Sequence, residues 1–152
     1  MYMREAFKLA EENVSKQLGG PFGCIIVKDG IIIARGSNKV TSTNDPTWHA
    51  EVDAIWIACE VLQSFQINDC ELYTSCEPCP MCVGAIYWAR PKAIYFGANK
   101  NDAADAGFDD WFIYQELDKL IPERKLPFKQ MLAEEGKKAF ELWKVFDDKT
   151  AY

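Results

Sequence analysis

Apolar residues recur at helical spacing at the start of the chain. They lie three or four residues apart and are Met3, Phe7, Ala10, Val14 and Leu18. This spacing indicates an amphipathic helix, and the glycine pair that follows Leu18 ends it. The chain is therefore predicted to open with a helix.

Two β-branched runs come next, in the sequence CIIVKDGIIIARG, on either side of Asp29-Gly30. Asp-Gly between two such runs is the strongest short-range signal of a β-hairpin. The stretch TSTNDPT beyond it is rich in turn residues, and Pro46 disfavours a helical conformation at Asp45. A hairpin followed by a loop is predicted.

Predicted helices and strands alternate through the rest of the chain. Val52, Ile55, Cys59 and Leu62 share one helical face, and a further helix is predicted from Pro78 through Tyr87. Residues 71–74 and 93–97 are predicted strands, and two more helices are predicted near 111–120 and 137–148. This alternation predicts an α/β domain with two or three layers around a mixed sheet.

Composition narrows the class of protein. The chain has 152 residues, 49% of them hydrophobic and 26% charged, which is typical of one globular domain with a real core. Its net charge of -6 argues against a nucleic-acid partner, because such affinity comes largely from Lys and Arg neutralising phosphates. Charges run through the N-terminal sequence MYMREAFKLAEENV, so no signal peptide or membrane span is expected and the predicted location is cytoplasmic.

The chain contains six cysteines. Disulfide frameworks belong to small secreted chains, whereas clustered cysteines in a reducing compartment are better candidates for metal ligands. Cys24, Cys59 and Cys70 stand singly among apolar or strand-like residues and are predicted to be small core fillers.

The candidate chemistry lies in two short motifs. HAE at residues 49–51 is followed about thirty positions later by PCPMC at residues 78–82. H-x-E followed by P-C-x-x-C is the signature of zinc deaminases. Cys79 and Cys82 are three residues apart, so on a helix their thiols project from one face, and the first turn of a helix favours thiolates.

These residue types predict a catalytic zinc site. His49, Cys79 and Cys82 give zinc three protein ligands and leave the fourth tetrahedral position for water. Zinc brings the pKa of such a water to about 7. Glu51 is not counted as a ligand and is predicted to move the proton from this water to the substrate and the departing amine. Burial beside apolar groups is expected to raise the pKa of Glu51.

Each motif alone has a plainer interpretation. A lone histidine is more often a core or surface residue than a ligand. The C-x-x-C pair could be half of a structural zinc knuckle, with Cys76 as a further ligand, or a redox pair. Pro78 is expected to leave Cys76 on the strand end, facing elsewhere, and a redox pair does not explain the HAE motif. The joint pattern therefore favours the catalytic site.

On these residues the chain resembles the cytidine deaminase superfamily, and within it the bacterial guanine deaminases. The resemblance runs from GGPFGCIIVKDG through NDPTWHAE and YTSCEPCPMCVGAIYWARPKAIYFGA to DAADAGFDDWFIYQE. NDPT-x-HAE and PCPMC-x-GAI also resemble transfer-RNA adenosine deaminases, whereas DAADAGFDD and the terminal Tyr152 resemble the guanine enzymes. The resemblance implies a three-layer αβα sandwich with a mixed central sheet, formed as a single domain over residues 1–152.

The resemblance also implies roles for individual residues. His49, Cys79 and Cys82 match the zinc ligands, and Glu51 and Asp110 match catalytic carboxylates. The implied substrate contacts are Phe22 as an aromatic wall, Asn38 as a hydrogen-bonding amide, Ala50, Trp88 and Tyr152. Trp48 departs from the pattern, because a small residue is usual before the zinc histidine.

The residues themselves leave three of these roles open. Phe22 could be an ordinary core residue and Asn38 a turn residue. Asp110, with Asp109 before it, could cap a helix that begins at Trp111. The flat faces and polar edge of a purine nevertheless suit an aromatic ring and an amide.

The implied reaction is hydrolysis of guanine to xanthine and ammonia, in purine catabolism or salvage. The implied assembly is a homodimer whose C-terminal segments, about residues 134–152, are exchanged so that Tyr152 closes the partner's pocket. The expected partner is a small purine, with no nucleic acid and no membrane. The alternatives are a transfer-RNA adenosine deaminase or another amino-purine or pyrimidine deaminase, and, from another class, a zinc-stabilised interaction module.

Overall fold

The predicted hairpin begins the central sheet. In the computed structural model, which describes residues 1–152, strands β1 (Gly23–Lys28) and β2 (Ile31–Ser37) pair antiparallel. Both turn residues have positive φ, 50° at Asp29 and 78° at Gly30. This is the conformation that an Asp-Gly hairpin turn requires, so the local turn chemistry explains the hairpin.

Two further strands complete a mixed sheet. Strand β3 (Cys70–Cys76) pairs antiparallel with β1, and β4 (Ala93–Ala98) pairs parallel with β3. The strand order is β2-β1-β3-β4. Parallel neighbours need a crossover, and helix α4 (Pro80–Ala89) provides it. The predicted mixed sheet is confirmed.

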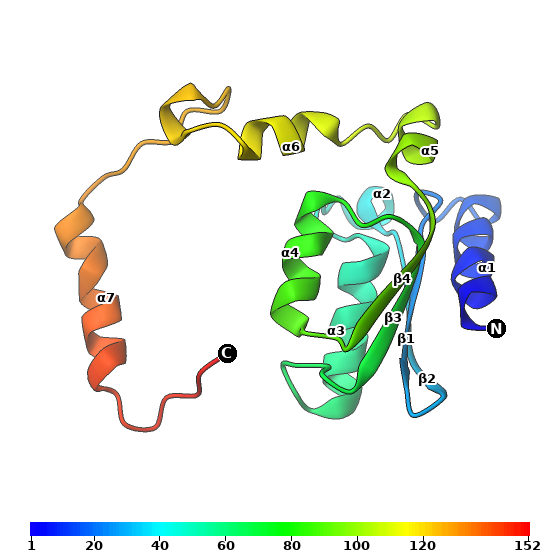
Figure 1. Ribbon diagram of the computed structural model, residues 1–152, viewed down its shortest axis with the longest axis horizontal. Helices are drawn as coiled ribbons and strands as arrows, with labels where there is room; N and C mark the ends of the chain where they lie inside the picture. The colour runs from blue at the N-terminus through cyan, green and yellow to red at the C-terminus, as the bar shows by residue number, and fades with distance from the viewer. The chain divides into compact units, whose positions relative to one another are not determined.

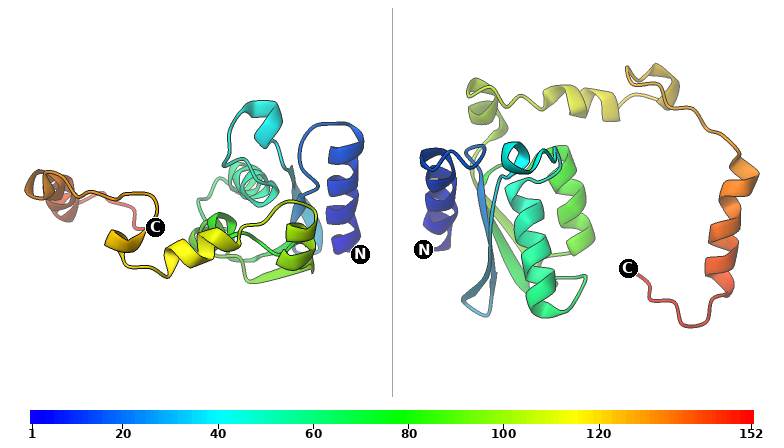
Figure 2. Two further views of the ribbon diagram at one scale, coloured as in Figure 1. Left: turned by 90° about the horizontal axis from the view of Figure 1, so that it is seen from above. Right: turned by 180° about the vertical axis from the view of Figure 1, so that it is seen from behind.

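Helices cover both faces of this sheet. Helix α1 (Tyr2–Ser15) lies on one face, and α3 (Ala50–Leu62) and α4 lie together on the other (Figures 1 and 2). The predicted three-layer αβα arrangement is therefore confirmed.

The buried face of α1 differs from the predicted apolar stripe. Ala6, Ala10 and Asn13 are buried, whereas Phe7 is 38% and Val14 51% exposed. The helix packs closely on β1, where a Cβ at Gly23 would lie 2.4 Å from the Ala6 carbonyl oxygen. Small side chains permit this approach, so they occupy the contact in place of the larger apolar ones.

Close packing also fixes the start of α3. A Cβ at Gly36 on β2 would lie 2.3 Å from the Ala50 carbonyl oxygen and 2.5 Å from the Ala54 backbone nitrogen. The first turn of α3 therefore lies directly against β2. This contact places the HAE motif at one end of the sheet.

Two local predictions need correction, and one short helix was not predicted. The stretch TSTNDPT, predicted as a loop, contains part of helix α2 (Val40–Thr43), which ends at Asn44 in a left-handed conformation. The helix predicted from Pro78 begins at Pro80. Helix α5 (Lys100–Asp105) was not predicted, because its six residues are too few for an apolar periodicity; the Asn99 side chain caps it.

The chain divides into two compact units, Met1–Trp111 and Phe112–Tyr152. Helix α6 (Trp111–Leu117) starts at the boundary, and the second unit continues with a 3-10 turn (Ile121–Glu123) and helix α7 (Ala133–Val145).

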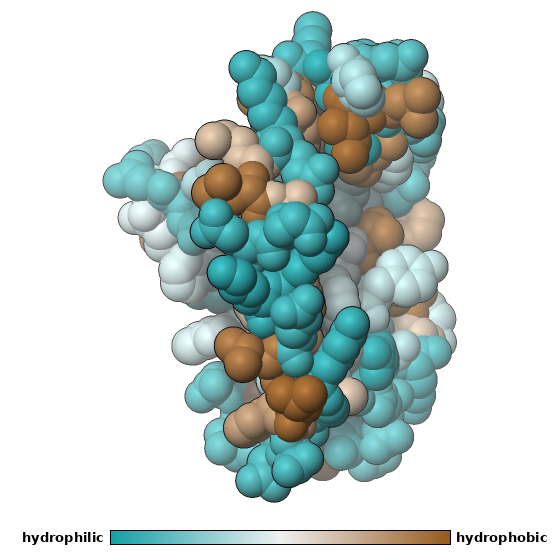
Figure 3. All heavy atoms as spheres, turned by 90° about the vertical axis from the view of Figure 1, so that its left-hand side faces the viewer, coloured by the Kyte–Doolittle hydropathy of each residue, from teal (hydrophilic) through white to brown (hydrophobic).

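None of the residues in α6 or α7 is buried, and the rings of Trp143 and Phe146 stack with centroids 6.3 Å apart. Apolar groups are interspersed with hydrophilic ones on the face drawn in Figure 3.

All six cysteines are free thiols in the structure. Cys24 and Cys70 are buried and Cys59 is half-buried, as expected for core fillers. The structure contains no helix with both the length and the apolar character that crossing a membrane requires.

Candidate zinc-binding active site

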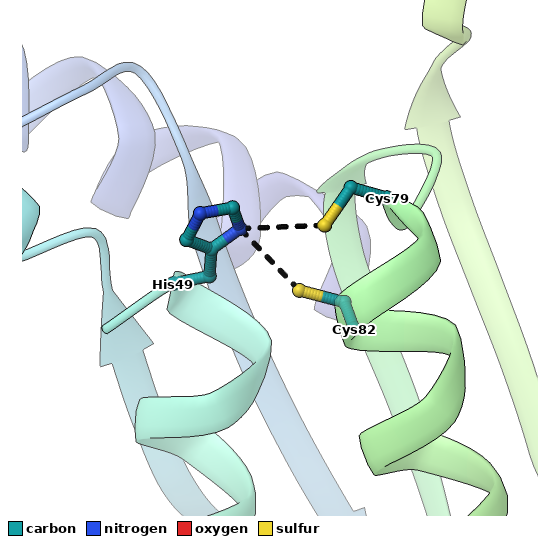
Figure 4. Close-up of side chains that lie close together, drawn as sticks. All are labelled: His49, Cys79 and Cys82. Atoms are coloured by element: carbon teal, nitrogen blue, oxygen red, sulfur yellow. Dashed lines mark hydrogen bonds between the residues drawn. The ribbon is translucent and has the colours of Figure 1, made fainter. Parts of the chain in front are cut away.

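Three side chains from the two sequence motifs converge on one point. The Nδ1 atom of His49 lies 3.5 Å from the Sγ atom of Cys79 and 3.5 Å from that of Cys82 (Figure 4). All three ligand atoms lie within 4.8 Å of one another. The structure therefore brings together the three residues that the motifs predicted as metal ligands.

The geometry of this cluster fits zinc. Zinc lies about 2.0–2.1 Å from histidine nitrogen and about 2.3 Å from cysteine sulfur, and tetrahedral angles then separate nitrogen from sulfur by about 3.5 Å. The two observed nitrogen–sulfur separations are both 3.5 Å. Two sulfurs and one nitrogen can thus hold zinc and leave one tetrahedral position for water.

The two helices supply the ligands from their N-terminal ends. His49 is the N-cap residue of α3 and Cys79 that of α4, and neither side chain makes a capping hydrogen bond. Pro80 occupies the first turn of α4, where its fixed φ suits a helix start. The sequence predicted both cysteines in the first turn of this helix. Cys82 lies within that turn, but Cys79 precedes it.

Hydrogen bonding distinguishes the two cysteines of the cluster. A hydrogen bond from the Cys82 thiol, with a further contribution from His49, lowers the pKa of Cys79 to about 4. The same bond raises the pKa of Cys82, because Cys82 is the donor. The adjacent Cys79 in turn raises the pKa of His49. Zinc binds the thiolate form of cysteine, so both sulfurs would be deprotonated when the metal is bound.

Cys76 does not join the cluster. It ends strand β3, and its sulfur lies 3.7 Å from the backbone oxygen of Asn99. Burial raises its pKa to about 11, which favours a neutral thiol. The prediction that Cys76 faces elsewhere is confirmed, and the structural-knuckle alternative loses its additional ligand.

Glu51 lies beside the cluster and is 5% exposed. Its Oε1 accepts a hydrogen bond of 2.8 Å from the Thr74 hydroxyl, and its Oε2 lies 3.4 Å from Cys82 Sγ. Burial raises the pKa of Glu51, as the sequence predicted. Thr74 was not identified from the sequence, because its role depends on β3 lying beside the start of α3.

Asn38 and Phe22 lie at the ends of the neighbouring strands. The Oδ1 atom of Asn38 accepts hydrogen bonds from the backbone N–H groups of Gly20 at 3.2 Å and Val40 at 3.3 Å. These bonds leave the amide Nδ2 as the group that can donate to a ligand. Phe22 packs edge-to-face against Phe108, with ring centroids 5.0 Å apart. Phe108 was not singled out, although it lies within the quoted segment DAADAGFDD.

Asp109 and Asp110 have different surroundings. Asp109 Oδ1 accepts a hydrogen bond from the Trp111 backbone nitrogen, so Asp109 fills the capping role that the sequence left open for the pair. Partial burial and the nearby charge of Cys79 raise the pKa of Asp110. Asp110 therefore lies within electrostatic reach of the cluster.

The other three predicted substrate contacts, Ala50, Trp88 and Tyr152, lie in different parts of the structure. Ala50 is fully buried as the first residue of α3. Trp88 is 63% exposed near the far end of α4, and a rise of 1.5 Å per residue puts it about 9 Å along the helix from Cys82. The structure does not bring Trp88 to the cluster. Tyr152 belongs to the second unit.

Trp48, the departure from the family pattern, has a specific partner. Its indole N–H donates a hydrogen bond of 2.8 Å to the buried carboxylate of Asp53.

Known proteins match both the fold and this site. Residues 1–98 match the cytidine and deoxycytidylate deaminase zinc-binding region. The chain is 57% identical over 151 residues to guanine deaminase of Bacillus subtilis strain 168, covering 99% of this chain and 97% of that one. The crystal structure of the Bacillus subtilis guanine deaminase matches with a TM-score of 0.97, covering 99% of this chain and 96% of that one.

A transfer-RNA-specific adenosine deaminase of Agrobacterium fabrum is 42% identical over 89 residues, which is 57% of this chain and 59% of that one. The zinc-ligating geometry and these matches agree. The chain belongs to the cytidine and deoxycytidylate deaminase family, and it carries that family's zinc-binding region.

Proposed function

We propose that this protein hydrolyses guanine to xanthine and ammonia. The main support is how much of the chain is similar to each relative. The match to the Bacillus subtilis guanine deaminase spans 151 residues, whereas the match to the Agrobacterium fabrum transfer-RNA adenosine deaminase spans 89. The net charge of -6 also favours a small purine over a polyphosphate.

His49, Cys79 and Cys82 are the proposed ligands of the zinc ion. When bound, zinc supplies Lewis-acid activation of the attacking water. Glu51 takes one proton from that water and delivers it to the ring nitrogen beside C2 of guanine. It then takes the second proton, from the hydroxyl now on C2, and delivers it to the departing amine. The carbon–nitrogen bond to the amine breaks, ammonia leaves, and the oxygen of water remains on C2.

The hydrogen bonds of Glu51 suit this task. Its Oε1 is occupied by the Thr74 hydroxyl, which leaves Oε2, on the side of Cys82, to carry the proton. The carboxyl is buried, so bulk water does not compete for that proton. Transfers of this kind typically contribute about 10²–10⁴ in rate.

Other residues are proposed to hold the guanine ring. The ring of Phe22, braced by Phe108, offers a flat apolar wall, and Asn38 Nδ2 offers a donor to an acceptor on the purine edge. Asp110 is the proposed second carboxylate that assists departure of the amine.

A substrate panel tests the reaction. Purified zinc-loaded protein is incubated with free bases, nucleosides and an anticodon stem-loop while ammonia is measured, with Glu51→Gln as the inactive control. Guanine should be turned over, and its rate should change little with salt. An enzyme that binds the phosphates of a nucleic acid would lose affinity for its substrate steeply as salt is added. Preferential deamination of adenosine in RNA would replace this proposal, and no ammonia from any substrate would favour an interaction module.

We further propose that the segment of about residues 134–152 is exchanged between two copies of the chain, with Tyr152 closing the partner's pocket. Helix α7 has 13 residues and no buried side chain. A helix of this length is marginal in water until an apolar face is covered. Phe140, Trp143 and Phe146 supply such apolar groups, and exchange of identical elements is a low-cost route to a dimer.

Truncation and mixing test this exchange. Removing Ala151 and Tyr152 should preserve zinc and the dimer while guanine turnover falls about tenfold or more, because the pocket stays open to water. Glu51→Gln chains co-refolded with truncated chains should regain activity, since one sound pocket receives an intact tail. Proven heterodimers as inactive as both parents would show that the tail acts on its own chain.

A further inference from the structure

A buried carboxylate outside the zinc cluster collects donors from three residues. Asp53, on α3 two residues after Glu51, is 2% exposed. Its Oδ1 accepts hydrogen bonds of 2.8 Å from Trp48 Nε1 and from Lys39 Nζ. Its Oδ2 accepts a bond of 3.1 Å from the Ser37 backbone N–H and lies 2.8 Å from the same Lys39 nitrogen. Each oxygen therefore has two donors, and the charge is balanced.

The donors to Asp53 flank two of the proposed site residues. Ser37 and Lys39 stand on either side of Asn38, and the third donor immediately precedes His49. A backbone hydrogen bond of 3.0 Å from the Lys39 nitrogen to the Trp48 oxygen joins the same two segments directly. The carboxylate thus ties the end of β2 to the turn that leads into α3.

Trp48 strengthens this tie in two ways. Its indole N–H reaches Asp53, and the Lys39 ammonium lies 5.4 Å from the centroid of its ring. The ring therefore lies beside the Lys39–Asp53 ion pair, whose lysine side chain is 37% exposed. A small residue at position 48 would provide neither contact.

We propose that Asp53 is a positioning residue that fixes Asn38 relative to His49 and Glu51, and that the indole N–H of Trp48 is one of the hydrogen-bond donors that it needs for this. Asp53 and its donors Ser37, Lys39 and Trp48 form a clamp. The proposal rests on the proposed function, because it assumes that Asn38 and Glu51 act on one substrate. Helix α3 holds Asp53 and Glu51 rigidly together, so clamping the residues on either side of Asn38 sets the position of its amide. A misplacement of about 1 Å in such a constellation can cost about 10²-fold in rate.

Two substitutions test the clamp with little change in shape. Asp53→Asn replaces one acceptor oxygen by an NH₂ group, which cannot accept from its neighbouring donors. Trp48→Phe removes the indole N–H and keeps an aromatic ring. For zinc-loaded protein, Asp53→Asn should lower kcat/KM for guanine by about tenfold or more, with a raised KM, and Trp48→Phe by a smaller factor.

The double variant should be little worse than Asp53→Asn alone, because both changes act through one carboxylate. Ile67→Val is the matched control: Ile67 is a buried core residue outside this network. At a temperature where all variants are folded, Ile67→Val should leave kcat and KM unchanged while lowering Tm. In the inactive Glu51→Gln background, Asp53→Asn should also weaken guanine binding measured by calorimetry.

Hydrogen exchange provides a readout that does not depend on the substrate. Asp53→Asn should speed amide exchange in peptides covering residues 36–49 and leave residues 70–76 of β3 unchanged. Unchanged kcat and KM in an active enzyme would overturn the proposal, as would additive effects in the double variant.

If the parent does not turn over guanine, the proposed function fails, and unchanged exchange over residues 36–49 would overturn the clamp separately. If Asp53→Asn does not fold, Trp48→Phe decides: kinetics and exchange equal to those of the parent would also refute the clamp.

Discussion

Replacing Thr74 by valine is expected to impair the proposed proton carrier while preserving the fold. The Thr74 hydroxyl is fully buried and donates to Glu51 Oε1 over 2.8 Å. Valine has nearly the same shape but no donor. A hydrogen bond to a charged group contributes about 1.5–3 kcal/mol, which corresponds to about 10- to 150-fold in rate. Because this bond holds the carboxylate in place, kcat should fall by about that factor.

Steady-state release of ammonia from guanine measures the effect, and metal analysis verifies one zinc per chain in each variant. Thr74→Ser is the matched control, since it keeps the hydroxyl and loses only a buried methyl group. Serine should retain kcat within a few-fold of the parent. If valine kept the parental kcat while serine lost it, Thr74 would act through packing and the reasoning would be refuted.

Three further predictions follow from the site and its support. Cys82→Ala should lose zinc on dialysis while Cys76→Ala keeps it, and the opposite result in metal analysis would contradict the ligand assignment. Glu51→Gln should retain zinc and fold but lose about 10²–10⁴ in turnover, so activity within tenfold of the parent would remove Glu51 from the mechanism. Gly36→Ala should lower the free energy of unfolding by about 1–3 kcal/mol in denaturant titrations, because the new Cβ would lie 2.3 Å from the Ala50 carbonyl oxygen; unchanged stability would show that α3 shifts without cost.

Features fixed by neighbouring residues could be predicted from the sequence. The Asp29-Gly30 turn determines the hairpin through local backbone preferences, and the structure has it at those residues. Cys79 and Cys82 are close in sequence, so their convergence follows from the backbone between them. His49 lies far from them along the chain. It could be predicted as a third ligand only because the HAE and PCPMC motifs together are specific for zinc deaminases.

Features that depend on distant packing could not be predicted. Thr74 bonds to Glu51 from another element, and nothing in either motif indicates it. The donors to Asp53 likewise become neighbours only when β2 and α3 pack together. Apolar periodicity predicted Phe7 on the apolar face of the first helix, but a hydropathy pattern does not show that the backbone at Ala6 is what packs against Gly23 of β1.

The two helices that meet at the cluster each begin at one of its ligand residues, and neither ligand side chain caps its own helix. Backbone N–H groups at a helix start need partners, and Ser, Thr, Asp or Asn usually supplies one. The side chains of His49 and Cys79 do not fill that role, and a zinc ion bound by both residues would instead link the two helix starts. Metal binding is then part of the folding free energy. In a cell short of zinc, the chain should be degraded by proteases instead of persisting as an idle enzyme, and its abundance should follow the zinc supply.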